Sequence, residues 1–262
     1  MCGAGGLPAR MAAEARRQGW RVVAFAFDGA PLELPHAARI VPSRITTLGP
    51  VVAELKAESA SAILLSGKFR HAAVLDGQPD ATVTRITERA GSLVDRHLLE
   101  AIVAMLADLG IAVLDQRPFL GDWLAPEGSW SNREPTDAEW ADIRAGFAIA
   151  RTMAKAQIGQ AVVMKQGAVL AVEAVEGTTE AIRRGSALGG PGTVVVKAVA
   201  TDHDYRFDTP TIGLETLGAA AAGGVATIAV EAGRVLIVDR EAVARRADAN
   251  GIALVSVADV GA

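Results

Sequence analysis

The most polar stretch of the chain is ATDHDYRFDTP, a loop that we expect over residues 200–210. It holds a histidine, Arg206 and three carboxylates, Asp202, Asp204 and Asp208. Carboxylate oxygens suit Mg²⁺, which phosphoryl-transfer enzymes use to neutralise developing charge. A zinc site is an alternative, but no second histidine-rich element is present to complete four ligands. A solvated acidic loop is the other interpretation, and composition alone favours it.

A second candidate is Glu173, which lies at the end of an apolar strand and shortly before a helix. An unpaired carboxylate in such a strand is costly, so we expect it to have an arginine, a metal or a ligand as its partner. Thr178 and Thr179 follow it and are typical helix-capping residues. A capping hydroxyl can also share a phosphate with the N–H groups beside it.

Two further segments have the composition of phosphate sites. The turn GAGGLP, which contains Gly5 and Gly6, precedes a helix, and backbone N–H groups at such a turn can bind a phosphate. Lys68 and Arg70 follow a buried strand, where ligands of open α/β sheets bind. The alternatives are a structural turn and two solvated cations. A dinucleotide site is disfavoured because the full G-x-G-x-x-G spacing and the preceding strand are missing.

The elements that position these residues differ between the two halves of the chain. In the first half, strands and helices alternate, which indicates a doubly wound parallel sheet. We therefore predict an N-terminal Rossmann-like α/β domain over residues 1–128. Its strands are expected at residues 20–27, 61–65 and 111–114, and its helices at 8–18, 48–57 and 94–109.

The second half is predicted to be an α+β domain with hairpins, over residues 129–262. One hairpin is expected around Gln166 and Gly167, and another across residues 231–234, between strands at 227–230 and 235–238. A helix is expected to begin at Thr136, which has a glutamate three residues on, as in a capping box. Further strands are expected at 193–199 and 252–257, and helices at 212–222 and 241–249.

Composition excludes several classes of protein. The 262 residues carry a net charge of −4, which excludes a strongly basic nucleic-acid binder. The single cysteine excludes an internal disulfide and a zinc site built from cysteines. No apolar run is long enough for a membrane span, and no secretory signal is visible, so a cytoplasmic protein is expected.

Three segments resemble those of the LpxI-type UDP-2,3-diacylglucosamine pyrophosphatases of lipid A biosynthesis. They are AVEA with EGT (171–178), RFDTPTIG (206–213), and VEAGR leading to DRE (230–241). Weaker matches are GGLP (5–8), GK (67–68), LAPEG (124–128) and IGQ (158–160). None of these is a generic motif, and their order along the chain is that of the family.

The resemblance implies an enzyme of two domains that binds its substrate between them. With Mg²⁺ it would hydrolyse UDP-2,3-diacylglucosamine at the α-phosphorus, giving UMP and 2,3-diacylglucosamine 1-phosphate. Asp208 stands at the family's essential aspartate and would ligate Mg²⁺ or orient the attacking water. The residues expected to bind substrate are Gly5, Gly6, Lys68, Gln160, Glu173, Thr178, Thr179, Lys197, Arg206 and Thr211. Of these, Lys197 and Arg206 would balance phosphate charge, together with the backbone amides near Gly5 and Thr178.

The expected partners are this lipid substrate, transiently the inner-membrane surface, and a second copy of the chain in a homodimer, with no nucleic acid. Two alternatives stay open: a relative that cleaves another nucleoside-diphosphate sugar or lipid, and a binding protein without activity. The chain departs from the family in three places. First, no strand precedes the glycines, which predicts two unpaired strand edges. Second, residues 200–204 have the sequence ATDHD, which differs from that of the family. Third, Thr179 stands where the family usually has an acidic residue.

Overall fold

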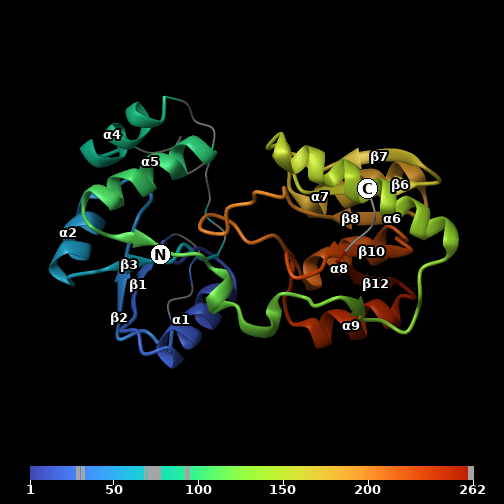
Figure 1. Ribbon diagram of the computed structural model, residues 1–262, viewed down its shortest axis with the longest axis horizontal. Helices are drawn as coiled ribbons and strands as arrows, with labels where there is room; N and C mark the ends of the chain where they lie inside the picture. The colour runs from blue at the N-terminus through green and yellow to red at the C-terminus, as the bar shows by residue number, and fades with distance from the viewer. Residues whose placement is uncertain (28–29, 31–32, 68, 70–77, 92–94, 259–262) are drawn as a thin grey trace. The chain divides into compact units, whose positions relative to one another are not determined.

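The computed structural model describes residues 1–27, 30, 33–67, 69, 78–91 and 95–258. The chain divides into two compact units (Figure 1). The first comprises Met1–Gly121 and Asp204–Asp208, and the second comprises Asp122–His203 and Thr209–Ala262. The short loop Asp204–Asp208 thus packs with the first unit, although the segments on both sides of it belong to the second.

The first unit contains short parallel strands, as its alternating pattern predicts. Cys2 forms parallel bridges to Ala26 on one side and to Ser66 on the other. Its N–H donates to the Phe25 carbonyl over 2.8 Å, and the Ser66 N–H donates to the Met1 carbonyl over 3.0 Å. The expected unpaired edges are therefore paired at this level by residues 1–3. The paired strands are β1 (Val23–Ala26) with β2 (Arg39–Pro42), and β3 (Ala62–Ile63) with β4 (Ala112–Val113).

Among the described residues of the first unit, three expected helices are present, together with one that was not expected. The unexpected helix, α4, begins after Asp80, whose carboxylate accepts the N–H groups of Thr82 and Val83. The same carboxylate accepts the Gly49 N–H over 2.6 Å, which ties the start of α2 to the start of α4. The helices are α1 (Leu7–Arg17), α2 (Gly49–Ala57), α4 (Ala81–Ala90) and α5 (Asp95–Asp108), with 3₁₀ turns at η1 (Arg117–Phe119) and η2 (Gly121–Trp123).

The second unit is built on a six-stranded mixed sheet of order β5-β12-β10-β8-β6-β7. The strands β8, β10 and β12 run parallel, whereas β6 and β7 form the expected antiparallel hairpin around Gln166 and Gly167. The strands are β5 (Gly128–Ser129), β6 (Ala161–Lys165), β7 (Ala168–Val172), β8 (Val194–Lys197), β10 (Thr227–Glu231) and β12 (Ala253–Val257).

The hairpin expected across residues 231–234 is wrong. Both edges of β10 are already paired, one with β8 and the other with β12, so no edge is left for the strand that follows. That strand, β11 (Leu236–Ile237), instead pairs in parallel with β9 (Thr211–Ile212). The mixed sheet therefore has a largely parallel centre, which an arrangement of successive hairpins does not produce.

Alternation along the central strands separates the two faces of this sheet. Val163 and Val195 belong to the core beneath α7, α8 and α9, whereas Met164 and Val196 belong to the core beneath α6. The helix α6 begins at the predicted capping box of Thr136. The helices are α6 (Asp137–Lys155), α7 (Thr178–Gly189), α8 (Leu214–Ala222) and α9 (Arg240–Ala249). None of the described helices has the length and apolar character needed to cross a membrane.

Candidate active site

Three of the predicted site residues form one hydrogen-bonded chain in the second unit. Lys197 is the last residue of β8, Glu173 follows β7, and Thr178 is the first residue of α7. The Lys197 ammonium donates to the Thr178 hydroxyl over 2.8 Å, and this hydroxyl donates to the Glu173 carboxylate over 2.7 Å. Lys197 also lies 3.4 Å from Glu173 directly. The partners of Glu173 are thus a lysine and a threonine, where the sequence suggested an arginine, a metal or a ligand.

This group lies in a largely dry environment. The side chain of Lys197 is 4% exposed and that of Glu173 is 12% exposed. Burial of either charge alone would be costly, so each depends on the other and on the hydroxyl between them. The residue at the N-cap of α7 is Gly177, and no side chain caps this helix. The capping role expected for Thr178 is therefore wrong, and its hydroxyl donates to Glu173 instead.

Gln160 reaches the same carboxylate through its backbone. Its N–H donates to Glu173 over 3.2 Å, and its carbonyl accepts the Ala198 N–H over 2.9 Å. The preceding residue must be glycine, because a Cβ on Gly159 would lie 2.1 Å from the Glu173 carbonyl oxygen. The glycine therefore lets the segment before β6 approach the end of β7.

The remaining two predicted residues of the second unit contribute less to this group. Thr179 is half-buried in the first turn of α7, and Thr211 begins β9 and donates its hydroxyl to the Thr209 carbonyl over 2.7 Å.

A second buried charge at the same edge of the sheet was not predicted. Glu231 ends β10 and is 3% exposed. Its carboxylate accepts hydrogen bonds from Arg151 over 2.9 Å, from Arg234 over 3.3 Å and from the Val199 N–H over 2.9 Å. The sequence signal that could have revealed it is a glutamate at the end of the apolar strand TIAVE.

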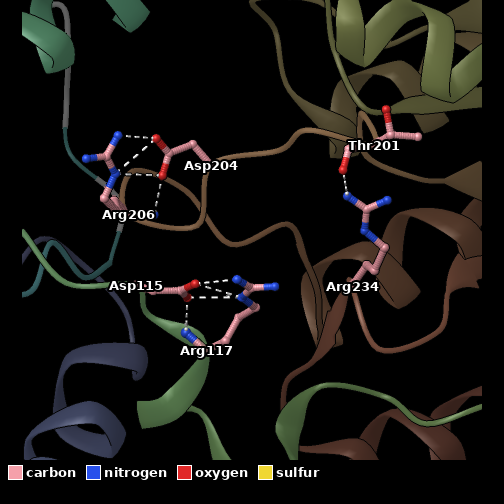
Figure 2. Close-up of polar contacts among 6 residues, drawn as sticks. All are labelled: Asp115, Arg117, Thr201, Asp204, Arg206 and Arg234. Carbon is pink, nitrogen blue, oxygen red and sulfur yellow. Dashed lines mark hydrogen bonds and ion pairs between the residues drawn. The ribbon is translucent and has the colours of Figure 1, made fainter.

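Arg234 also fixes the start of the polar loop. Its guanidinium donates to the carbonyl of Ala200 over 2.5 Å. It also donates to the carbonyl of Thr201 over 3.2 Å (Figure 2). Lys197 and Glu231 end neighbouring parallel strands, so both clusters occupy the carboxyl edge, where ligands of such sheets bind.

The predicted glycines of the first unit form an exposed turn. Gly5 has a φ of +101°, which favours glycine, and Gly6 stands directly before α1. Gly67, which follows β3, also has a positive φ, and a Cβ there would lie 2.7 Å from the Ala4 carbonyl oxygen. The glycine turn and the loop after β3 therefore lie against each other. Lys68 lies outside the described residues.

The loop Asp204–Asp208 contacts the rest of the first unit through Tyr205, whose carbonyl accepts a hydrogen bond from the Gln116 N–H over 3.1 Å. Arg206 donates to Asp204 with its side chain over 2.6 Å and with its backbone N–H over 3.0 Å, and Asp115 and Arg117 form a similar pair (Figure 2). The hydrogen bond from Arg206 to Asp204 raises the pKa of Arg206. The Arg117 guanidinium lies over the Tyr205 ring at 4.5 Å. Arg206 is therefore committed to a partner within its own loop.

Asp208 is exposed at the end of this loop and lines a cavity of the first unit, together with Gly67. Among the described residues, no three histidines, cysteines or acids gather closely enough to hold a metal ion by themselves. Mg²⁺ needs fewer protein ligands, because it commonly takes one or two carboxylates and completes its shell with waters and substrate phosphates. The exposed carboxylate of Asp208 fits that mode of binding.

Both halves of the chain match known protein families. Residues 1–123 match the family described as LpxI N-terminal domain, and residues 126–255 match LpxI C-terminal domain. The chain is similar to UDP-2,3-diacylglucosamine pyrophosphatase LpxI from Caulobacter vibrioides. The two are 32% identical over 224 residues, which cover 81% of this chain and 80% of that protein.

Proposed function

The chain belongs to the LpxI family, and on this premise we propose that it hydrolyses UDP-2,3-diacylglucosamine to UMP and 2,3-diacylglucosamine 1-phosphate in lipid A biosynthesis. The observation that carries the proposal is the similarity to the pyrophosphatase from Caulobacter vibrioides, which extends over most of both chains. The sequence resemblance in the segment that contains Asp208 supports the same reaction.

In the proposed reaction, the oxygen of a water molecule bonds to the α-phosphorus, and the bond from this phosphorus to the bridging oxygen breaks. The lipid 1-phosphate leaves with the bridging oxygen, and the water oxygen stays on UMP. We assign to Asp208 the role of accepting a hydrogen bond from the attacking water. Its exposure supports this role, because a carboxylate that orients water must be accessible to substrate and solvent.

Lys197 and Thr178 are proposed to balance phosphate charge. Their hydrogen bond places a buried ammonium group beside the first turn of α7, where the helix dipole and backbone N–H groups also favour anions. Preorganised positive charge of this kind stabilises the charge that develops on phosphoryl oxygens. In the first unit, Arg206 and the backbone N–H groups near Gly5 are proposed to balance phosphate charge in the same way. We also propose that the first unit has a Rossmann-like fold.

Mg²⁺ is the proposed cofactor, with Asp208 as its protein ligand. When bound, the ion would neutralise charge on the phosphate oxygens. The acyl chains of the proposed substrate belong in a bilayer, so we also propose that the protein works in the cytoplasm in transient contact with the inner-membrane surface.

The test is to incubate the purified protein with UDP-2,3-diacylglucosamine and Mg²⁺ in ¹⁸O-labelled water, beside Asp208→Ala. The proposal expects UMP that carries the label from the wild type, and none from the variant. A folded wild-type protein that releases no UMP would overturn the proposed reaction. Label in the lipid phosphate would overturn attack at the α-phosphorus.

A further inference from the structure

The loop that carries Asp208 is closed by its own hydrogen bonds. The Asp204 carboxylate accepts the backbone N–H of Arg206 over 3.0 Å and the side chain of Arg206 over 2.6 Å (Figure 2). The carbonyl of Asp204 accepts the N–H of Phe207 over 3.3 Å. These bonds join Asp204 to the residues two and three positions further on. The loop is therefore a compact turn up to the residue before Asp208.

Tyr205 anchors this turn to the rest of the first unit. It is 3% exposed, although residues of loops usually lie on the surface. Its carbonyl accepts the N–H of Gln116, which is 2% exposed. Because burial of a large aromatic ring is strongly favourable, the ring of Tyr205 fixes the place at which the turn packs.

Arg117 covers the ring of Tyr205 with a fixed cation. Its guanidinium lies 4.5 Å from the centre of the ring. Asp115 holds this guanidinium, since its carboxylate accepts the Nε–H of Arg117 over 2.9 Å and the backbone N–H over 2.8 Å (Figure 2). The side-chain hydrogen bond to Asp115 raises the pKa of Arg117, so the group stays charged in the neutral range. A cation over the face of an aromatic ring is attracted to it, which strengthens the anchor.

The anchoring residues stand at the carboxyl edge of the parallel strands β3 and β4. Residues 115–117 follow β4 closely, and the Leu114 N–H donates to the Ile63 carbonyl at the end of β3 over 2.9 Å. Ligands of parallel sheets bind at this edge. The turn thus holds the exposed carboxylate of Asp208 in the part of the first unit where a ligand is expected.

We propose that Tyr205 and Arg117 are positioning residues, which hold the carboxylate of Asp208 in place for hydrolysis of the substrate. The inference rests on the proposed function, because that function assigns the attacking water to Asp208. An exposed carboxylate on an unanchored loop samples many positions, and a misplacement of about 1 Å can slow a reaction on the order of 100-fold. Tyr205 and Arg117 are assigned no contact with the reacting atoms, and both act through Asp208.

The first test measures hydrogen exchange in the folded protein, independently of any reaction. Peptides that cover residues 203–209 are followed by mass spectrometry in the wild type, Tyr205→Ala and Arg117→Met. The amides of Arg206 and Phe207 are expected to exchange about ten-fold faster or more in Tyr205→Ala, because the turn loses its anchor. In Arg117→Met the increase should be about two- to five-fold, as for loss of a partly exposed cation over a ring.

The matched control is Trp130→Leu in the second unit, which removes a ring that lies under Arg240 at the same distance of 4.5 Å. It should leave the exchange of the turn unchanged. Tyr205→Phe keeps the ring under Arg117 and should also resemble the wild type. Circular dichroism verifies that each variant is folded. Wild-type exchange in Tyr205→Ala would overturn the inference, as would an equal increase in Trp130→Leu or Tyr205→Phe.

The second test asks whether the anchor acts through Asp208. Tyr205→Ala is expected to lower kcat for UMP release about 10- to 100-fold and to leave KM within about two-fold of the wild type. In the Asp208→Asn background the same change should have no further effect on kcat, because the carboxylate that it displaces is already gone. A tyrosine that only stabilises the fold would lower kcat by the same factor in both backgrounds, and that result would contradict the inference.

The two proposals fail in different ways. If the wild type and Tyr205→Ala release UMP with the same kcat, the positioning role is wrong and the proposed function stands. If the folded wild type releases no UMP, the proposed function is wrong, and hydrogen exchange still decides whether Tyr205 anchors the turn that carries Asp208.

Discussion

The ammonium group of Lys197 lies 2.8 Å from the hydroxyl oxygen of Thr178, which itself lies 2.7 Å from the carboxylate of Glu173. The threonine hydroxyl has one proton and two lone pairs. The lysine is a donor only and the carboxylate an acceptor only, so this hydroxyl must donate to Glu173 and accept from Lys197. The direction of both hydrogen bonds is therefore fixed by the neighbours of Thr178.

We expect Thr178→Val to lower the free energy of unfolding by about 1–3 kcal/mol, because valine leaves Lys197 and Glu173 without the hydroxyl between them. Thr178→Ser retains the hydroxyl and should stay close to the wild type. Urea-induced unfolding measures both values. Valine and serine variants of equal stability would show that the hydroxyl carries no such energy.

Lys197 and Glu173 should be strongly coupled. Lys197→Met leaves a buried carboxylate, and Glu173→Gln leaves a buried ammonium, so each single change is destabilising. The double variant should be more stable than the sum of the two losses predicts, by about 0.5–3 kcal/mol. A double-mutant cycle in urea measures this coupling. Lys197→Met combined with Asp80→Asn, in the other unit, is the control pair and should be additive.

Glu231→Ala should destabilise the protein, because the Val199 N–H and the two arginines lose the carboxylate that accepts their hydrogen bonds. Removal of one member of a fully buried pair typically costs about 3–5 kcal/mol. We expect a smaller loss of about 2–3 kcal/mol, because Arg151 is 33% exposed and Arg234 is 25% exposed.

The control for this loss is Glu241→Ala, which removes a glutamate that is 93% exposed. We expect it to change the stability by less than about 0.5 kcal/mol, as exposed positions usually do. Urea unfolding compares the two variants, and similar losses in both would contradict the structural role of Glu231.

Much of the fold follows from local pattern, and the exceptions have identifiable causes. Helices with a clear apolar stripe or a capping box, such as the one that begins after Thr136, were predicted within about two residues. The second hairpin was not, because the pairing of β10 depends on β8 and β12, which are distant in sequence. Local alternation carries no information on which edges are already occupied.

The candidate site shows the same division. The cost of a lone carboxylate predicted that Glu173 has a partner, but the identity of that partner depends on where β8 ends. Thr178 is of a residue type that often caps helices, yet its hydroxyl donates to a nearby buried carboxylate instead. The grouping of Asp208 with the first unit follows from tertiary packing of Phe207, which no periodicity encodes.

Acid should weaken the first unit through Asp80. Burial raises the pKa of this carboxyl, but hydrogen bonds from the N–H groups of Val83, Gly49 and Thr82 outweigh burial and hold the pKa below its usual 3.8. A lowered pKa in the folded state means that the stabilisation is complete above the unfolded pKa and is lost as the pH falls through the folded value.

Asp80→Asn keeps a side-chain oxygen at the start of α4 but does not titrate in this range. Stability is therefore expected to fall less between about pH 5 and pH 2 in the variant than in the wild type. Thermal unfolding across this range measures the difference. Parallel pH profiles of the two proteins would exclude a contribution from Asp80.

The carboxylate of Asp208 should be needed for turnover and not for folding. Asp208 is exposed, so Asp208→Asn is expected to leave the melting temperature within about 2 °C of the wild type. An amide accepts a hydrogen bond from water only weakly and is a poor ligand for Mg²⁺, so kcat for UMP release should fall by about 10²–10⁴-fold. Asp202→Asn removes another exposed carboxylate from the polar stretch and should retain full activity. Titration of Mg²⁺ against rate should give a saturating curve in the wild type and the Asp202 variant. An Asp208→Asn protein with the same curve would remove this residue from the reaction.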